Sequence, residues 1–205
     1  LARRVEAAAI ISDESSIEFL TPIKQPGKII CVGLNYSEHR DEAGVTKKAE
    51  YPDFFIRVHN SVTAHGKPII RPQKSADFDF EGELAVIIGK KARGLDSTAG
   101  FGPYLVTPDE LPRSVKEGLR LETRLNGNTV QSASTANLIF DVPTLLSMIT
   151  EGMTLEPGDV IVTGTPSGVG LARTPKLYMK HGDLVEVAIE GVGLLRNPVQ
   201  DEIPA

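Results

Sequence analysis

Hydrophobic and polar residues form short runs along this chain, and the pattern predicts many short strands. Apolar or alternating runs bounded by turn residues predict strands over residues 28–33, 54–58, 68–70, 119–125, 160–162 and 184–189. No internal repeat or low-complexity tract interrupts them. We therefore expect a chain built mainly from strands, with turns at close intervals.

The longest strand signal covers Phe78–Lys90. Successive side chains of a strand point to opposite faces. One face would carry Phe78, Phe80, Gly82, Leu84 and Val86, and the other Asp79, Glu81, Glu83 and Ala85. Beyond Ala85 the run is apolar on both faces, which predicts a strand end that is covered on both sides.

Two segments carry helix signals. Residues 35–44 have a charged middle, with Ser37 placed to cap the N-terminus and Gly44 placed to end the helix. Residues 141–152 begin at Asp141, a favourable N-cap, and place apolar residues on one side. We expect about two helices.

The dipeptide Asn126-Gly127 lies between alternating runs and predicts a hairpin. Both central residues of a type I′ turn need a positive φ, which Asn and Gly tolerate best. Because strands greatly outnumber helices and do not alternate with them, we expect a β-rich α+β fold.

Composition narrows the class of protein. The 205 residues suffice for one domain, and a net charge of −5 argues against nucleic acid or an anionic membrane as a partner. No apolar run approaches the roughly 20 residues that span a bilayer. The single Cys31 excludes an internal disulfide and, within an apolar run, is expected to be a buried hydrophobe, which favours a cytoplasmic location. The chain starts at Leu1 and not at Met, without a signal-peptide pattern, so we expect a fragment or a processed product.

Glu81-Gly82-Glu83 is the first candidate for chemistry. On a strand, both carboxylates point the same way and can hold one hard divalent cation, and Gly82 allows close approach of another group. A solvated strand face is the alternative. The apolar residues that continue the glutamate face place the pair at the rim of a covered surface.

His39 and Glu42 are the second candidate, because residues three apart are neighbours on a helix. A carboxylate beside an imidazole orients it and raises its basicity, as a general base requires. An ordinary surface pair on a charged helix is the alternative.

A glycine-rich loop over residues 163–170 is the third candidate, because its amides can line an anion site. It lacks the Gly-Lys-Ser/Thr ending of a P-loop, so it does not predict nucleotide binding. A tight loop without a ligand is the alternative. Arg57 is either an edge residue reaching solvent or a clamp for a carboxylate, and the remaining histidines are expected at the surface: His59, His65 and His181.

Four blocks together resemble the fumarylacetoacetate hydrolase family, particularly its small bacterial members that act on acylpyruvates and related 2-oxo acids. They are Lys28–His39, Asp79–Gly89, Asn126–Asp141 and Met153–Gly170, and the end from Gly182 to Pro198 also fits. The resemblance covers nearly everything after residue 27. It implies a small N-terminal segment and linker over 1–27, a catalytic domain over 28–205, a mixed β-roll or β-sandwich, and a homodimer.

The resemblance also implies roles for individual residues. Glu81 and Glu83 would be ligands of Mg²⁺ or Mn²⁺, and His39 with Glu42 would form the dyad that activates water or moves a proton. Gly164 and Thr165 would contact the substrate's carboxylate or keto oxygen, and Arg57 would lie near the substrate.

One departure from the family pattern lies after Arg93-Gly94, where Leu95-Asp96-Ser97 follows directly. The family has a longer segment here, with a third metal carboxylate and a lysine that faces the substrate. Because a true deletion would cripple fold and site together, we expect a segment missing from the sequence and a break between Gly94 and Leu95.

The expected activity is cleavage or rearrangement of a C–C bond next to a 2-oxo acid, as in hydrolysis of an acylpyruvate or fumarylpyruvate, through an enolate that the divalent ion stabilises. Decarboxylation of oxaloacetate and isomerisation of a hydroxymuconate-type diacid are alternatives at the same site. A catalytically inactive scaffold that binds a ligand is an alternative of another class.

Overall fold

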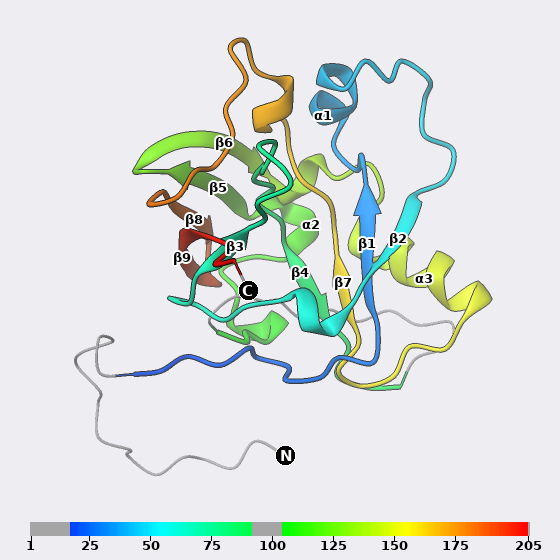
Figure 1. Cartoon of the computed structure of the whole chain (residues 1–205). Coiled ribbons are helices and arrows are strands. Elements are labelled where there is room, and N and C mark those ends of the chain that lie inside the picture. The colour runs from blue at the N-terminus through cyan, green and yellow to red at the C-terminus, as the bar shows by residue number, and fades with distance from the viewer. Residues whose placement is uncertain (1–16, 92–103, 205) are drawn as a thin grey trace.

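The computed structural model describes residues 17–91 and 104–204, where nine strands form two sheets accompanied by short helices (Figure 1). The first sheet has the order β2-β1-β7-β4 and the second the order β3-β9-β8-β5-β6. The bounds are β1 Ile29–Gly33, β2 Asp53–Arg57, β3 Ile69–Arg71, β4 Ala85–Ile87, β5 Arg120–Leu125, β6 Asn128–Ser134, β7 Val160–Val162, β8 Leu184–Ile189 and β9 Gly193–Asp201. The β-rich α+β class expected from the pattern is confirmed.

The helices are short and lie between strands. They are α1 Ser37–Glu42, α2 Val115–Gly118 and α3 Val142–Gly152, with 3₁₀ turns at His59–Ser61, Pro108–Glu110, Thr135–Asn137 and Gly170–Ala172. Within the described ranges no helix has the length and hydrophobicity needed to cross a membrane.

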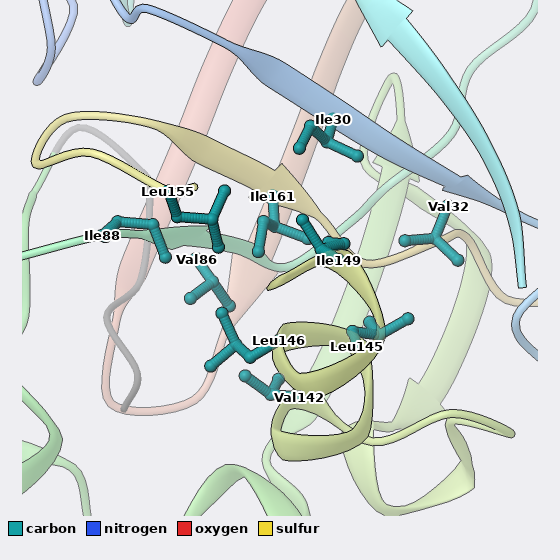
Figure 2. Close-up of a cluster of buried hydrophobic side chains, with 10 residues drawn as sticks. All are labelled: Ile30, Val32, Val86, Ile88, Val142, Leu145, Leu146, Ile149, Leu155 and Ile161. Carbon is teal, nitrogen blue, oxygen red and sulfur yellow. The ribbon is translucent and has the colours of Figure 1, made fainter. Parts of the chain in front are cut away.

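Helix α3 packs one face of the first sheet into a core (Figure 2). Asp141 caps it as predicted, accepting hydrogen bonds from the Thr144 amide and hydroxyl. The core consists of Ile30, Val32, Val86, Ile88, Val142, Leu145, Leu146, Ile149, Leu155 and Ile161. The opposite face of the same strands forms a second buried cluster of Ile29, Cys31, Ala85, Ile87 and Val160. The first sheet is therefore covered on both faces, as the apolar end of the 78–90 run predicted.

The hairpin at Asn126-Gly127 is confirmed: these two residues have φ of 52° and 78° and join β5 to β6. The strands predicted over 160–162 and 184–189 have those same bounds. The strands predicted over 28–33, 54–58, 68–70 and 119–125 differ by one residue at one or both ends, and β6 and β9 had no predicted bounds.

Two local predictions are wrong. Only Ala85–Ile87 of the predicted 78–90 strand joins a sheet, because side chains bind the backbone of the preceding residues, as described below. Ser37 is the first helical residue and not the cap; Tyr36, with extended backbone, is the N-cap and makes no side-chain cap bond. Gly44 lies just past the helix end, in the left-handed region at φ 73°.

The predicted break between Gly94 and Leu95 falls outside the described residues. So does most of the predicted N-terminal segment, of which the structure describes residues 17–27. Both stay predictions.

Candidate active site

Three strands of the first sheet have ends that lie together at one end of the sheet. β1 and β7 run parallel, with Cys31 paired to Val162, and β4 runs antiparallel to β7, with Ala85 opposite Val162. The chain leaving β1, the chain leaving β7 and the chain entering β4 therefore lie next to one another. These three segments carry His39, the glycine-rich loop and the Glu-Gly-Glu sequence.

The backbone of Gly82 is held by side chains on both sides. Its N–H donates to Gln131 Oε1 at 2.8 Å, and its carbonyl accepts from Thr165 Oγ1 at 3.1 Å. Gln131 Nε2 in turn donates to Thr165 Oγ1 at 2.8 Å and to the Pro166 carbonyl at 2.9 Å. Any Cβ at position 82 would lie 1.9 Å from Thr123 Oγ1, so only glycine fits. The close approach predicted for Gly82 is real, and its partners are side chains.

Glu81 and Glu83 flank this clamp. Burial alternates as expected: Phe80, Gly82 and Leu84 are buried, whereas Glu81 is exposed and Glu83 half-buried. Burial and the Glu81 charge raise the pKa of Glu83 to about 8, although the Gly164 N–H donates to its Oε2. Burial also raises the pKa of Glu81, and a positive charge on His39 would offset part of this rise. The negative charges of the two carboxylates therefore repel each other, and a cation between them would relieve this repulsion.

The His39–Glu42 pair is formed. His39 Nδ1 lies 2.7 Å from Glu42 Oε1, and the imidazole is buried with 9% of its surface exposed. Since an ionised carboxylate can only accept, Nδ1 is the donor, and in the neutral imidazole Nε2 is the nitrogen free to act as a base. Glu42 accepts from Gly168 and Glu83 accepts from Gly164, so the dyad and the acidic segment are bound by the same loop. The geometry is that of a base oriented by a carboxylate.

The glycine-rich loop donates its amides to three carboxylates of the protein itself. Gly164 N–H reaches Glu83, Gly168 N–H reaches Glu42 Oε2 at 2.8 Å, and the Gly170 and Leu171 amides each reach Asp79 at 2.7 Å. In Figure 1, α1 lies beside the turn that contains Gly170. The loop thus ties the acidic segment and helix α1 together, and the anions that it demonstrably binds are side chains.

Of the predicted substrate-contacting residues, Gly164 and Thr165 lie at this end of the sheet, whereas Arg57 on β2 pairs with Ile29, toward the other end of β1. Thr165 is buried, and its hydroxyl is engaged by Gly82 and Gln131. Gly164 packs so closely against Asn35 that a Cβ would lie 2.8 Å from the Asn35 Cβ. Arg57 is exposed on edge strand β2, and its charge lowers the pKa of Glu81 and of Glu83.

The remaining predicted residues behave as expected with one exception. Cys31 is a buried free thiol whose pKa burial raises. His59 and His181 are exposed. His65 is half-buried: its ring packs on Phe19 with centroids 4.8 Å apart, so its surface assignment is only partly right.

Two residues that organise the site were missed from the sequence. Gln131 bridges Gly82 to the loop; it is buried beside Val130 on β6, where burial does not alternate, so the sequence pattern gave no signal for it. Asn35 is fully buried; its Nδ2 donates to the carbonyls of Phe140 and Thr163, and its Oδ1 accepts from the Phe140 amide. A buried amide that binds two chain segments gives no local pattern, because its partners are distant in sequence.

The donor set suits a hard divalent cation. Glu81 and Glu83 offer carboxylate oxygens, which Mg²⁺ and Mn²⁺ prefer, and Mg²⁺ is commonly bound by one or two carboxylates together with water and substrate. Within residues 17–91 and 104–204, no three His, Cys, Asp or Glu side chains gather as a metal-binding group. In the described part of the chain, Glu81 and Glu83 are therefore a candidate pair of ligands, which would leave coordination positions open.

Comparison with known proteins gives relatives along nearly the whole chain. Oxaloacetate tautomerase Fahd2a, mitochondrial, of Rattus norvegicus is 34% identical over 237 residues, covering 97% of this chain and 75% of the relative. The solved 5-carboxymethyl-2-hydroxymuconate delta-isomerase from Mycobacterium smegmatis has a TM-score of 0.75 and 29% identity, covering 91% of this chain and 83% of that one. Maleylpyruvate hydrolase from Sphingobium sp. SYK-6, solved with manganese (II) ion and pyruvate, has a TM-score of 0.74 and 26% identity, covering 89% and 74%.

The family model for the fumarylacetoacetate (FAA) hydrolase C-terminal domain matches residues 28–99 and 91–200. Its two pieces meet around Gly94, and the alignment to the rat protein is longer than the 205 residues of this chain. Relatives thus carry residues that have no counterpart here. From the family match, the relatives and the shared fold, we conclude that this chain belongs to the fumarylacetoacetate hydrolase family and is related to its enzymes.

Proposed function

We propose that this protein is a divalent-metal-dependent enzyme of 2-oxo acids, and that its reaction is the keto–enol conversion of an oxaloacetate-type acid. The observation that carries the proposal is the imidazole of His39, oriented by Glu42, with Glu42 and Glu83 bound by the same loop. Proton transfer at a carbon next to a keto group needs a base of this kind and an electrophile for the keto oxygen. The rat relative named as an oxaloacetate tautomerase supports this choice of substrate.

Four residues have proposed roles in the chemical step. Glu81 and Glu83 would hold Mg²⁺ or Mn²⁺, which supplies a Lewis acid for the keto oxygen and the carboxylate of the substrate. His39 Nε2 would remove the proton from the carbon next to the keto group, and the imidazolium so formed would deliver it to the enolate oxygen; the reverse reaction moves the proton from the enol oxygen to the carbon. Glu42 holds Nδ1 protonated and stabilises the imidazolium that forms.

Three residues are proposed to position the substrate. Arg57 adds a positive charge for a carboxylate, and Gly164 and Thr165 border the substrate at the loop. Because the Thr165 hydroxyl is already engaged, its backbone is the group that we expect to contact the substrate.

Hydrolysis of an acylpyruvate is the second candidate. The solved maleylpyruvate hydrolase with manganese and pyruvate supports it. The same imidazole would then deprotonate a water that attacks the acyl carbonyl, and the electrons of the broken C–C bond would pass to the pyruvate enol. A hydroxymuconate-type isomerisation, supported by the solved isomerase, needs only the proton transfer.

A substrate panel tests the proposal. Enol oxaloacetate, acetylpyruvate and fumarylpyruvate are each assayed with Mg²⁺, with Mn²⁺ and with EDTA. We expect metal-dependent turnover of oxaloacetate tautomers, and Glu81→Gln should reduce it more than about 100-fold, since losing a ligand costs at least as much as losing the group that orients one. Glu50→Gln, which removes an exposed carboxylate that pairs with Lys47 at the surface, is the matched control. Unchanged turnover in Glu81→Gln would rule out the metal role, and no turnover of any substrate would favour the inactive scaffold.

We also propose that the protein forms a homodimer through β2. All five residues of this edge strand are exposed, including Phe54, Phe55 and Ile56 with 41%, 52% and 73% of their surfaces accessible. Antiparallel pairing of two copies about Phe55 would place Phe54 of each opposite Ile56 of the other, which would cover an edge that otherwise invites aggregation.

Light scattering after gel filtration tests the dimer. Ile56→Lys should give a monomer, whereas Ile70→Lys, an exposed isoleucine on β3 at the edge of the second sheet, should not. A monomeric wild-type protein, or a dimer unaffected by Ile56→Lys, would contradict this interface.

The cytoplasmic location also stays a prediction. The buried free thiol of Cys31 agrees with a reducing compartment. The rat relative carries the word mitochondrial in its name, so fractionation of cells that produce the full protein is the direct test.

A further inference from the structure

The carboxylate of Glu42 has a second partner besides His39. Its Oε2 accepts the Gly168 N–H at 2.8 Å, while its Oε1 lies 2.7 Å from His39 Nδ1. The helix that carries both residues is six residues long and has no side-chain cap. The orientation of the dyad therefore depends on where the loop holds the Gly168 amide.

Gly168 is itself held from the side opposite to Glu42. Arg173 Nε donates to the Gly168 carbonyl at 3.0 Å, and Arg173 Nη2 donates to the Val130 carbonyl on β6. Gly168 adopts φ +102°, and a Cβ there would lie 2.3 Å from the Val130 oxygen. One guanidinium thus connects this glycine to a strand of the second sheet, next to Gln131 in sequence.

These contacts form a continuous series from β6 to the imidazole: Arg173 to Gly168, Gly168 to Glu42, and Glu42 to His39. We propose that Arg173 is a positioning residue for the catalytic dyad, acting through Gly168 and Glu42; this rests on the proposed function of His39. The carbonyl that Arg173 binds and the N–H that Glu42 binds belong to different peptide groups on either side of one Cα. Arg173 therefore acts by fixing the φ and ψ of Gly168, and not by polarising a shared peptide.

Arg173 suits this task better than a lysine. Its planar guanidinium can donate to two carbonyls in fixed directions, whereas an ammonium acts as a point donor on a flexible stem. The side chain is half-buried and lies beyond the loop from α1, so it does not contact His39 or the acidic pair through any hydrogen bond in the described residues. Its removal should leave the substrate-binding groups in place and misalign the base.

A double-mutant cycle on the full-length protein tests the inference. Arg173→Gln should lower kcat by about 10- to 100-fold with KM changed less than about 2-fold, because small misplacements of a catalytic group cost rates of this size. In the Glu42→Gln background the same change should cost less than about 2-fold, since the dyad is already broken. Arg173→Lys should recover part of the loss. Lys176→Gln, which removes an exposed positive charge three residues further on, is the matched control and should leave kcat unchanged.

An NMR measurement separates this inference from the proposed function. The Gly168 amide proton, bonded to a carboxylate, should shift upfield in Glu42→Gln and in Arg173→Gln, but not in Lys176→Gln. Equal losses of kcat from Arg173→Gln with and without Glu42, or an unmoved Gly168 resonance, would overturn the role of Arg173 while leaving the dyad intact. If Glu42→Gln alone leaves kcat unchanged, the proposed function fails, and the Gly168 shift still reports whether the series of contacts exists. Should Arg173→Gln fail to fold, Arg173→Lys supports the same cycle.

Discussion

Val86 of the core around α3 lies only three residues after Glu83, yet the core and the segment that carries Glu81 and Glu83 are held by different forces. Around α3, ten apolar side chains are buried together, and the backbone is paired in the sheet. Around Gly82 the backbone pairs with no neighbouring strand, and the side chains of Gln131 and Thr165 bind its amide and carbonyl. Packing is non-directional and tolerates adjustment, whereas hydrogen bonds set direction. The residues of the α3 core therefore stabilise the fold, whereas the residues around Gly82 orient the two carboxylates.

Leu145→Ala should cause the largest loss of stability. Leu145 is fully buried in the α3 core, and truncation of such a leucine costs about 2–5 kcal/mol of unfolding free energy. Because the site is held separately, kcat of the folded fraction should stay within about 2-fold of wild type. Urea unfolding and steady-state kinetics on the same sample provide the check. A large fall in kcat at full folding would show that the two regions are not separable.

Gly82→Ala should affect the site more than the stability of the fold. Its Cβ would overlap Thr123 Oγ1, so the glutamates on either side must move, at a cost of about 1–3 kcal/mol in stability and a loss of divalent-ion affinity. Gly89→Ala, where nothing lies within 4 Å of the added Cβ, is the matched control. Adding Thr123→Ala to Gly82→Ala should recover part of the affinity. Equal Mn²⁺ binding by Gly82→Ala and wild type, measured by calorimetry, would be inconsistent with the clamp.

Gln131→Leu keeps the side-chain volume and removes three hydrogen bonds. The Gly82 amide loses its acceptor, and Thr165 loses a donor. We expect metal affinity to fall about 10- to 100-fold, the range typical of groups that orient metal ligands. Gln131→Glu should keep the acceptor for Gly82 and recover part of this loss. An unchanged affinity in both variants would mean that Gly82 is held by shape alone.

Asp141→Ala should have the smallest effect, about 1 kcal/mol, because it removes the cap of α3 but none of its packing. The Thr144 hydroxyl holds the pKa of Asp141 below its usual value. The cap therefore stabilises the fold fully above the ordinary pKa of an aspartate, and this contribution fades as pH falls below it. Thermal unfolding between pH 3 and 7 should show wild type and variant converging at the acid end. A constant difference across this range would contradict the pKa direction.

The contrast between the packed core and the hydrogen-bonded segment around Gly82 also explains which features could be predicted from the sequence. The hairpin at Asn126-Gly127, the capped helix after Asp141 and the buried strand at 160–162 rest on local patterns, and all three are confirmed. The alternation across residues 78–84 correctly predicted which side chains are buried. It wrongly predicted that a neighbouring strand would bind the backbone of these residues. Period-two burial says which side is covered, but it does not say whether a strand or a side chain binds the backbone.

The site shows the limit most clearly. His39 and Glu42 could be paired from their spacing alone, and the structure forms that pair. The bonds from Gly168 to Glu42 and from Asn35 to Thr163 join residues 126 and 128 positions apart. No local pattern encodes such contacts, because they follow from the parallel pairing of β1 with β7.

That pairing has a consequence for the order of events during synthesis. Contacts between distant parts of a chain form slowly, since a long loop has to close before they are gained. A growing polypeptide that has delivered α1 and both glutamates still lacks β7 and the loop that follows it. Catalytic competence should therefore appear late and all at once, when the final third of the molecule docks against the first.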